Sequence, residues 1–195
     1  LGGRPWPEWD APRASREPAA LRKARRTHRT AIRNVRILQF LFMRQWDRLR
    51  SYCHDRDIRI IGDIPIFVAH DSADVWAHRD LFYMDDTGQP SVIAGVPPDY
   101  FSATGQLWGN PIYRWDVMEH RGYQWWTDRM RATLDLVDLV RIDHFRGFEA
   151  YWEVPASETT AINGRWVPGP RDGIFHALSN ALGDLPIVAE NLGLI

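Results

Sequence analysis

The chain has 195 residues, of which 24 are basic and 25 acidic, so its formal net charge is −1. This balance gives no electrostatic argument for binding nucleic acid or an anionic membrane. No apolar run approaches the roughly 18 residues of a membrane-spanning helix, and the single cysteine cannot form an internal disulfide. The length suits one domain with a hydrophobic core, or a section of a larger barrel.

The N-terminal part, residues 1–28, is rich in proline, arginine and tryptophan and lacks a helical or strand period, so we expect an irregular lead-in. The basic cluster at 22–26 is interpreted as a solvated face at the start of a helix. Between 30 and 53, apolar residues recur at three- and four-residue steps with arginines between them. This pattern predicts an amphipathic helix that lies on a sheet.

The rest of the chain alternates apolar runs with helical patterns. We expect strands at 57–68, 138–143 and 186–189, and helices at 122–134 and 173–182. The segment 78–116 has little periodicity and is predicted to be a long irregular loop, which in a compact domain is more often functional than decorative. Strands that alternate with helices predict an α/β fold with a parallel sheet, and their apolar character predicts a sheet buried on both faces.

Two of these strands deliver a carboxylate at their C-terminal ends. Asp143 ends one strand and Glu190 follows another, which is how a (β/α) barrel aims two acids into one cleft. Arg141 lies two residues before Asp143, on the same face of the strand, and favours the ionised carboxylate that a nucleophile needs. The apolar run before Glu190 favours the protonated form of a general acid. Each acid alone also fits a structural role, Asp143 as the partner of Arg141 at a strand end and Glu190 as a helix cap or ion-pair partner. Paired carboxylates of this kind hydrolyse or transfer glycosidic bonds.

The segment 95–111 is stiffened by prolines and carries the aromatic residues Tyr100, Phe101 and Trp108, which could stack on sugar rings or pack as ordinary core. The ten tryptophans of the chain leave the same two interpretations open. The run 70–74 contains His and Asp but matches no common metal-binding spacing, so we expect Asp71 or Ser72 to cap a helix and expect no metal.

Several long motifs, in order, resemble 4-α-glucanotransferases, the amylomaltases or disproportionating enzymes of glycoside hydrolase family 77 in the α-amylase clan. They are IGDIPIFVAHDSADVW (61–76), GVPPDYFSATGQLWGNP (95–111), RIDHFRGFEAYWEVP (141–155), INGRW (162–166) and AENLG (189–193). The resemblance implies a (β/α)8 TIM barrel with long insertions in its βα loops. Residues 29–195 would be its central part, about strands 3 to 5, truncated at both ends.

The resemblance also implies the roles of individual residues. Asp143 would be the nucleophile, Glu190 the acid/base, and Arg141 the residue that holds the nucleophile. The residues implied to bind substrate are Asp63, Asp99, Tyr100, Phe101, Trp108, Asn110 and His144. The substrates would be α-1,4-glucans and maltooligosaccharides, with no cofactor, no metal, no nucleic acid and no membrane. The family's third carboxylate, an aspartate after a histidine, would lie beyond Ile195.

Two alternatives remain open on the residues alone: an α-glucan hydrolase of the same clan, in which water attacks the intermediate, and a non-catalytic glucan-binding barrel. Both chain ends suggest a section of a longer protein, inactive alone, in which a targeting segment could precede Leu1. We expect a cytoplasmic location. The oligomeric state is left open.

Overall fold

The computed structural model describes residues 2–190. Its α-helices are α1 (Ala11–Ala14), α2 (Pro18–Thr27), α3 (Arg29–His54), α4 (Ala73–Ala77), α5 (Trp115–His120), α6 (Gln124–Leu134) and α7 (Asp172–Leu182). The 3-10 helices are η1 (Trp6–Glu8), η2 (Arg79–Leu81) and η3 (Phe145–Phe148). The strands are β1 (Ile61–Pro65), β2 (Val92–Val96), β3 (Gln106–Pro111), β4 (Leu139–Asp143), β5 (Ala150–Pro155), β6 (Arg165–Pro168) and β7 (Ile187–Ala189).

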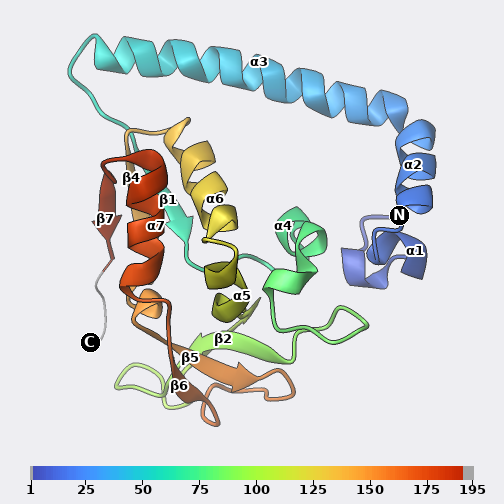
Figure 1. Cartoon of the computed structure of the whole chain (residues 1–195), viewed down its shortest axis with the longest axis vertical. Coiled ribbons are helices and arrows are strands. Elements are labelled where there is room, and N and C mark those ends of the chain that lie inside the picture. Colours follow the sequence, from blue (N-terminus) through green and yellow to red (C-terminus); the bar gives the residue numbers. More distant parts are fainter. Residues whose placement is uncertain (1, 191–195) are drawn as a thin grey trace.

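A parallel sheet has the strand order β1-β4-β7, and helices α6 and α7 lie beside it (Figure 1). Helix α6 lies between β1 and β4 in the chain, and α7 lies between β4 and β7, so each helix connects two neighbouring parallel strands. This confirms the predicted alternation of helices and strands. Parallel neighbours require such crossovers, and they bring the carboxyl ends of all three strands to one edge of the sheet.

One face of this sheet is buried and the other is open. Val140 and Ile142 are fully buried and share a hydrophobic core with Trp126 of α6 and Ile174 of α7. On the opposite face the side chains are charged or exposed, and Ile61 is 62% accessible. The prediction of a sheet buried on both faces is therefore wrong for residues 2–190, because the second face carries polar side chains that no described element covers.

The segment 78–116, expected to be irregular, contributes two strands to a second sheet. In this antiparallel sheet, of order β3-β2-β5-β6, β2 and β3 come from the connection after β1, and β5 and β6 from the connection after β4. Both connections leave the carboxyl ends of the parallel strands, so the second sheet is built beside that edge (Figure 1). The pairing of β2 with β5 joins segments that are far apart in the sequence and leaves little local signal. The hydrophobic periodicity of the chain therefore did not predict this sheet.

The N-terminal part is not an irregular lead-in. It forms η1, α1 and α2, and prolines stand in the first turn of each because their fixed φ suits a helix start. Trp6 is buried, and its Nε1 donates a hydrogen bond to the carbonyl of His70 at 2.6 Å. The prolines of this part therefore stand at helix starts, and the expectation of an irregular lead-in is wrong.

Helix α3 agrees with the predicted helix, but it does not lie on a sheet. In Figure 1 helix α3 runs above the parallel sheet. The C-terminal part of the helix contacts the residues just before β4, through Trp46 and Arg50. Its apolar side chains are largely exposed, with Val35 58%, Leu38 65% and Phe42 49% accessible. The periodicity identified the apolar stripe correctly, but no described residues cover it.

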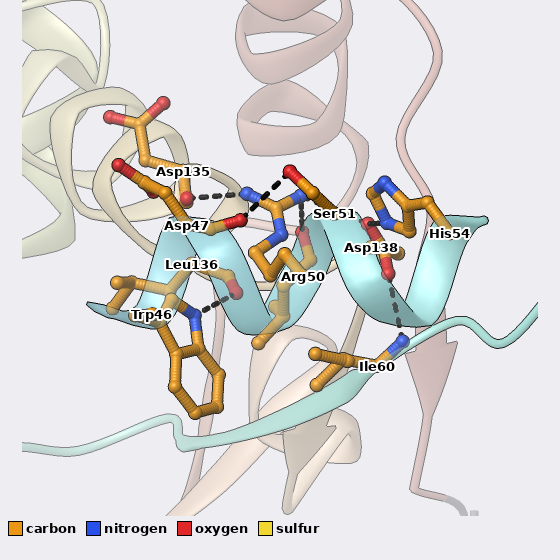
Figure 2. A network of polar contacts seen from close by, with 10 residues as sticks. Trp46, Asp47, Arg50, Ser51, His54, Ile60, Asp135, Leu136 and Asp138 are labelled. Atoms are coloured by element: carbon orange, nitrogen blue, oxygen red, sulfur yellow. Dashed lines mark hydrogen bonds and ion pairs between the residues drawn. The ribbon is translucent and has the colours of Figure 1, made fainter. Parts of the chain in front are cut away.

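The C-terminal end of α3 is fixed to the sheet by a polar network around Asp138, the residue before β4 (Figure 2). Its carboxylate accepts hydrogen bonds from Arg50 at 2.9 Å and from the Ile60 backbone N–H at 2.8 Å, and it pairs with His54 at 2.8 Å. Burial alone would raise the pKa of Asp138, but these hydrogen bonds outweigh it and lower the pKa to about 2. One carboxylate thus joins α3, the start of β1 and the start of β4.

Replacing Asp138 with asparagine is expected to lower the free energy of unfolding by about 2 kcal/mol at pH 7, because hydrogen bonds to a charged group contribute about 1.5–3 kcal/mol. Since folding lowers the pKa of this carboxyl group from 3.8, its contribution is complete above about pH 4 and is lost as the pH falls towards 2. Urea unfolding followed by tryptophan fluorescence at pH 7 and pH 3 would show the difference between the two proteins shrinking at the lower pH.

The matched control is Asp135→Asn, because Arg50 contacts the backbone carbonyl of Asp135 and not its carboxylate. We expect this exposed substitution to change stability by less than about 0.5 kcal/mol. Equal losses in the two variants would contradict the proposed anchoring role of Asp138.

Candidate active site

Three of the predicted residues meet at the carboxyl ends of β1 and β4. Asp63 and Arg141 are register partners in the parallel pair, and Asp143 lies two residues further along β4 on the same face. Arg141 donates one hydrogen bond from Nη1 to Asp63 Oδ2 at 2.6 Å and another from Nη2 to Asp143 Oδ1 at 2.9 Å. A single guanidinium therefore bridges two carboxylates and fixes their separation.

This cluster is partly solvated, with side-chain accessibilities of 59% for Asp63, 35% for Arg141 and 53% for Asp143. Desolvation alone would lower the pKa of Arg141, but the hydrogen bonds and charges of the two aspartates raise it. Ion pairs with this degree of exposure contribute little to stability. We therefore interpret the main role of the bridge as orienting Asp143, and not as stabilising the fold.

Glu190 continues the strand register beside this cluster. Its backbone N–H donates to the carbonyl of Ile142 at 3.2 Å, which extends the β4–β7 pairing by one position and places Glu190 in the same row as Asp143. Its carboxylate Oε2 accepts a hydrogen bond from the backbone N–H of His144 at 3.0 Å. The two predicted acids therefore lie on adjacent strands with their side chains on one face.

The surroundings of Glu190 differ from the expectation. The apolar run before it was predicted to bury it, but β7 lies at the edge of the sheet and Val188 and Ala189 are exposed. The described part of β7 therefore does not bury Glu190 as the apolar run suggested. The AENLG motif extends to residue 193, and its residues 191–193, including Asn191, lie outside the described residues.

His144 turns the chain sharply after β4. It adopts the left-handed conformation, with φ 57° and ψ 44°, and its side chain is buried, with 8% of the residue accessible. Its ring packs edge-to-face against Trp108, with centroids 4.8 Å apart. Burial and, to a smaller extent, the nearby charge of Arg146 lower the pKa of His144, which favours the neutral imidazole.

An open cavity of about 610 Å³ lies in front of these residues. It is lined by Pro65, Ile66, Phe67, Val68, Ala69, Ser72, Asp74, Trp108, Asn110, Asp143 and His144. Asn110 is held by a hydrogen bond from its Nδ2 to the carbonyl of Val68 at 3.0 Å. The structure thus brings four of the predicted residues, from segments more than thirty positions apart, to one cavity.

The other predicted loop residues do not line this cavity. Asp99 Oδ1 accepts hydrogen bonds from the backbone N–H groups of Phe101 and Ser102, so its carboxylate closes its own turn. Tyr100 and Phe101 pack edge-to-face on each other and are 92% and 89% accessible. Asp99 therefore has a local structural role, and two aromatic rings are presented to solvent.

The tryptophans divide between core and surface. Trp6, Trp115 and Trp126 are buried, whereas Trp108 and Trp166 are 37% and 42% accessible. The interpretation as core residues therefore holds for the buried tryptophans, whereas Trp108 lines the cavity.

Sequence reasoning missed Arg129, which lies on α6. Its Nη2 donates to the carbonyl of Pro65 at 2.6 Å and its Nη1 to that of Ile66 at 3.1 Å, and the hydroxyl of Tyr113 donates to the same Ile66 carbonyl at 2.8 Å. These contacts fix the end of β1 where it enters the cavity. The only local signal is the pair Trp125 and Trp126, whose rings lie beneath the guanidinium.

In the segment 70–74, Ser72 caps α4 by accepting a hydrogen bond from the Val75 N–H, as predicted. Within residues 2–190, no group of three His, Cys, Asp or Glu side chains is arranged to hold a metal ion. None of the described helices is both long enough and apolar enough to cross a membrane.

The structure places Arg141 between two carboxylates at the carboxyl edge of a parallel α/β sheet, with Glu190 in register beside Asp143. Paired carboxylates at this edge are an arrangement that glycoside-cleaving enzymes of the α/β class use. All 195 residues match the profile of glycoside hydrolase family 77, described as 4-alpha-glucanotransferase. The chain belongs to this family.

Curated relatives and a solved structure agree with this assignment. The chain is 53% identical over 194 residues to the 4-alpha-glucanotransferase of Thermus thermophilus and 54% identical over 195 residues to that of Synechocystis. It covers 39% of each relative, which in turn matches 100% and 99% of the chain. An amylomaltase from Streptococcus agalactiae, solved in complex with acarbose, superimposes with a TM-score of 0.95 at 44% identity over 100% of this chain and 39% of that chain.

Proposed function

We propose that this chain is the catalytic section of a 4-α-glucanotransferase that moves a segment of an α-1,4-glucan to a glucose or maltooligosaccharide acceptor. The observation that carries the proposal is the bridge from Arg141 to Asp143, with Glu190 in register on the next strand. Membership of the family and the acarbose complex of the S. agalactiae amylomaltase support the substrate class.

In the proposed mechanism an Asp143 carboxylate oxygen attacks the anomeric carbon of the donor while the bond from that carbon to the glycosidic oxygen breaks. Glu190 gives its proton to the departing oxygen. The resulting β-glucosyl ester is then attacked by the 4-hydroxyl of the acceptor, whose proton returns to Glu190 as the ester bond to Asp143 breaks. Two inversions retain the α configuration, and neither a cofactor nor a metal takes part.

The remaining site residues receive binding roles in this proposal. Trp108, Asn110 and His144 line the cavity in front of Asp143 and would contact the sugar, and Asp63 would do so from the neighbouring strand. The exposed rings of Tyr100 and Phe101 offer stacking faces for an acceptor, and Asp99 holds their turn. The cytoplasmic location stays a prediction.

We further propose that residues 29–195 supply about strands 3 to 5 of a (β/α)8 barrel. The open face of the β1-β4-β7 sheet, with its charged side chains, would then face the barrel interior. The chain spans 39% of the length of the curated relatives cited above, which supports a larger whole. The 195 residues alone would be inactive, because an open sheet leaves the outer edges of β1 and β7 unpaired within residues 2–190 and leaves side chains such as Ile61 exposed, whereas a closed barrel would cover both.

The test is to incubate the full-length polypeptide with maltotriose and to resolve the products by chain length. Glucose together with a ladder of longer maltooligosaccharides is the expected result. Shorter sugars alone would make the protein a hydrolase, in which water replaces the acceptor hydroxyl. Binding of maltotriose without turnover would leave a glucan-binding protein and would overturn the catalytic proposal.

Arg141→Lys is expected to lower kcat/KM for maltotriose by about 10- to 100-fold without unfolding the protein. A lysine ammonium lacks the planar fork that reaches two carboxylates at once, so Asp143 would lose its fixed orientation. The control is Arg131→Lys, which affects a surface pair with Asp128 on α6 and is expected to leave activity unchanged. Equal kinetics for Arg141→Lys and the wild type would show that the bridge does not position the nucleophile.

A further inference from the structure

The end of β4 is fixed from both sides. The carbonyl of Asp143 accepts a hydrogen bond from the Ile66 N–H at 3.2 Å, on the β1 side. On the β7 side, the next N–H along the chain, that of His144, donates to Glu190 Oε2 at 3.0 Å. The backbone that carries the candidate nucleophile is therefore bonded directly to the side chain of the candidate acid/base.

The direction of this N–H depends on the left-handed conformation of His144. Residues with a Cβ rarely adopt it, because the Cβ then approaches the following carbonyl oxygen, so the surroundings must impose it. The His144 ring is packed on the edge of Trp108, and Gly147 leaves room for it: a Cβ at Gly147 would lie 3.2 Å from the ring Cδ2. Packing of the His144 ring between Trp108 and Gly147 therefore holds the backbone of His144 in the left-handed conformation.

We propose that His144 is a positioning residue, whose backbone N–H, presented by the left-handed turn after β4, orients the carboxylate of Glu190 relative to Asp143. The inference rests on the proposed function for the role of Glu190, and it assigns to the backbone of His144 a task separate from any sugar contact of its ring. The position of the Glu190 carboxylate is then fixed by the backbone next to Asp143, and not by β7 alone.

The test compares His144→Gly with His144→Ala in the full-length polypeptide. Both variants lose the ring, but glycine adopts the left-handed conformation freely while alanine resists it. We expect kcat for maltotriose to be about tenfold higher for His144→Gly than for His144→Ala, with similar KM values. Asparagine, which tolerates this conformation, is expected to behave like glycine. Equal rates for glycine and alanine, or a slower glycine variant, would overturn the proposal.

Amide hydrogen exchange tests the contact without any turnover. In the full-length protein the His144 amide is expected to exchange at least about tenfold faster in Glu190→Ala than in the wild type, because its acceptor is removed. An unchanged exchange rate would overturn the inference even if one of the His144 variants fails to fold. If the exchange result is as expected but wild-type protein does not process maltotriose, the contact stands and the proposed function fails.

Discussion

Asp143→Asn in the full-length polypeptide is expected to abolish glucan transfer, with kcat for maltotriose falling by at least about 10⁴-fold. Asparagine is nearly isosteric and keeps an oxygen that can accept the hydrogen bond from Arg141 Nη2, so the fold and the bridge to Asp63 should persist. The neutral amide cannot attack the anomeric carbon to form the glucosyl ester. Chromatography of the maltotriose products, together with a thermal melt to verify folding, would measure both effects.

The matched control is Asp63→Asn, since Asp63 accepts the other hydrogen bond of the same guanidinium. This variant removes the other charge that faces Arg141 but leaves the nucleophile, so we expect a loss of only about 10- to 100-fold. Equal activities of the two variants would contradict the assignment of Asp143 as nucleophile, because both would then act only through Arg141.

The parallel sheet could be predicted because its signals are local. Each strand is a short apolar run, of which β4 ends at Asp143 and β7 is followed by Glu190, and each connecting helix has its own period. The antiparallel sheet could not be predicted in this way. Strand β3 contains Gly109, with φ +79°, and ends at Pro111, and its partner β2 also pairs with β5, which follows β4 in the chain. The glycine and proline weaken the local strand signal of β3, and the β2–β5 pairing joins segments too far apart for one sequence window.

The same distinction applies to the site. That Arg141 and Asp143 share a face follows from the two-residue period of a strand, and the structure confirms it. The second partner of Arg141, Asp63, depends on the register between β1 and β4, which no local pattern fixes. The contact from His144 to Glu190 uses a backbone N–H, and every residue except proline has one, so its identity carries no signal.

Helix α3 shows what periodicity leaves open. The spacing of Val35, Leu38 and Phe42 correctly predicted a helix with an apolar stripe, but not the surface that covers it. In the structure the helix is held by the polar contacts of Arg50 and His54 near its end, and such contacts between distant segments are invisible to a hydrophobic pattern.

Glu190→Gln is expected to separate the two steps of the proposed mechanism. With maltotriose, whose leaving group needs a proton, kcat should fall by about 10²- to 10⁴-fold, the usual contribution of general acid–base catalysis. With α-maltosyl fluoride the leaving group departs without protonation, so formation of the glucosyl ester on Asp143 should persist. Transfer to the acceptor still needs a base, and the ester should therefore accumulate.

Intact-protein mass spectrometry after mixing Glu190→Gln with α-maltosyl fluoride would detect this ester as a mass increase of one maltosyl group. The double variant Asp143→Asn, Glu190→Gln is the control and is expected to show no increase, because it lacks the nucleophile. If Glu190→Gln forms no ester with the fluoride donor, the substitution must impair more than proton transfer, and the assignment of Glu190 as acid/base alone would be contradicted. A mass increase in the double variant would place the nucleophile elsewhere than β4. The roles assigned to two neighbouring strands are thus tested separately, although their carboxylates share one row of the sheet.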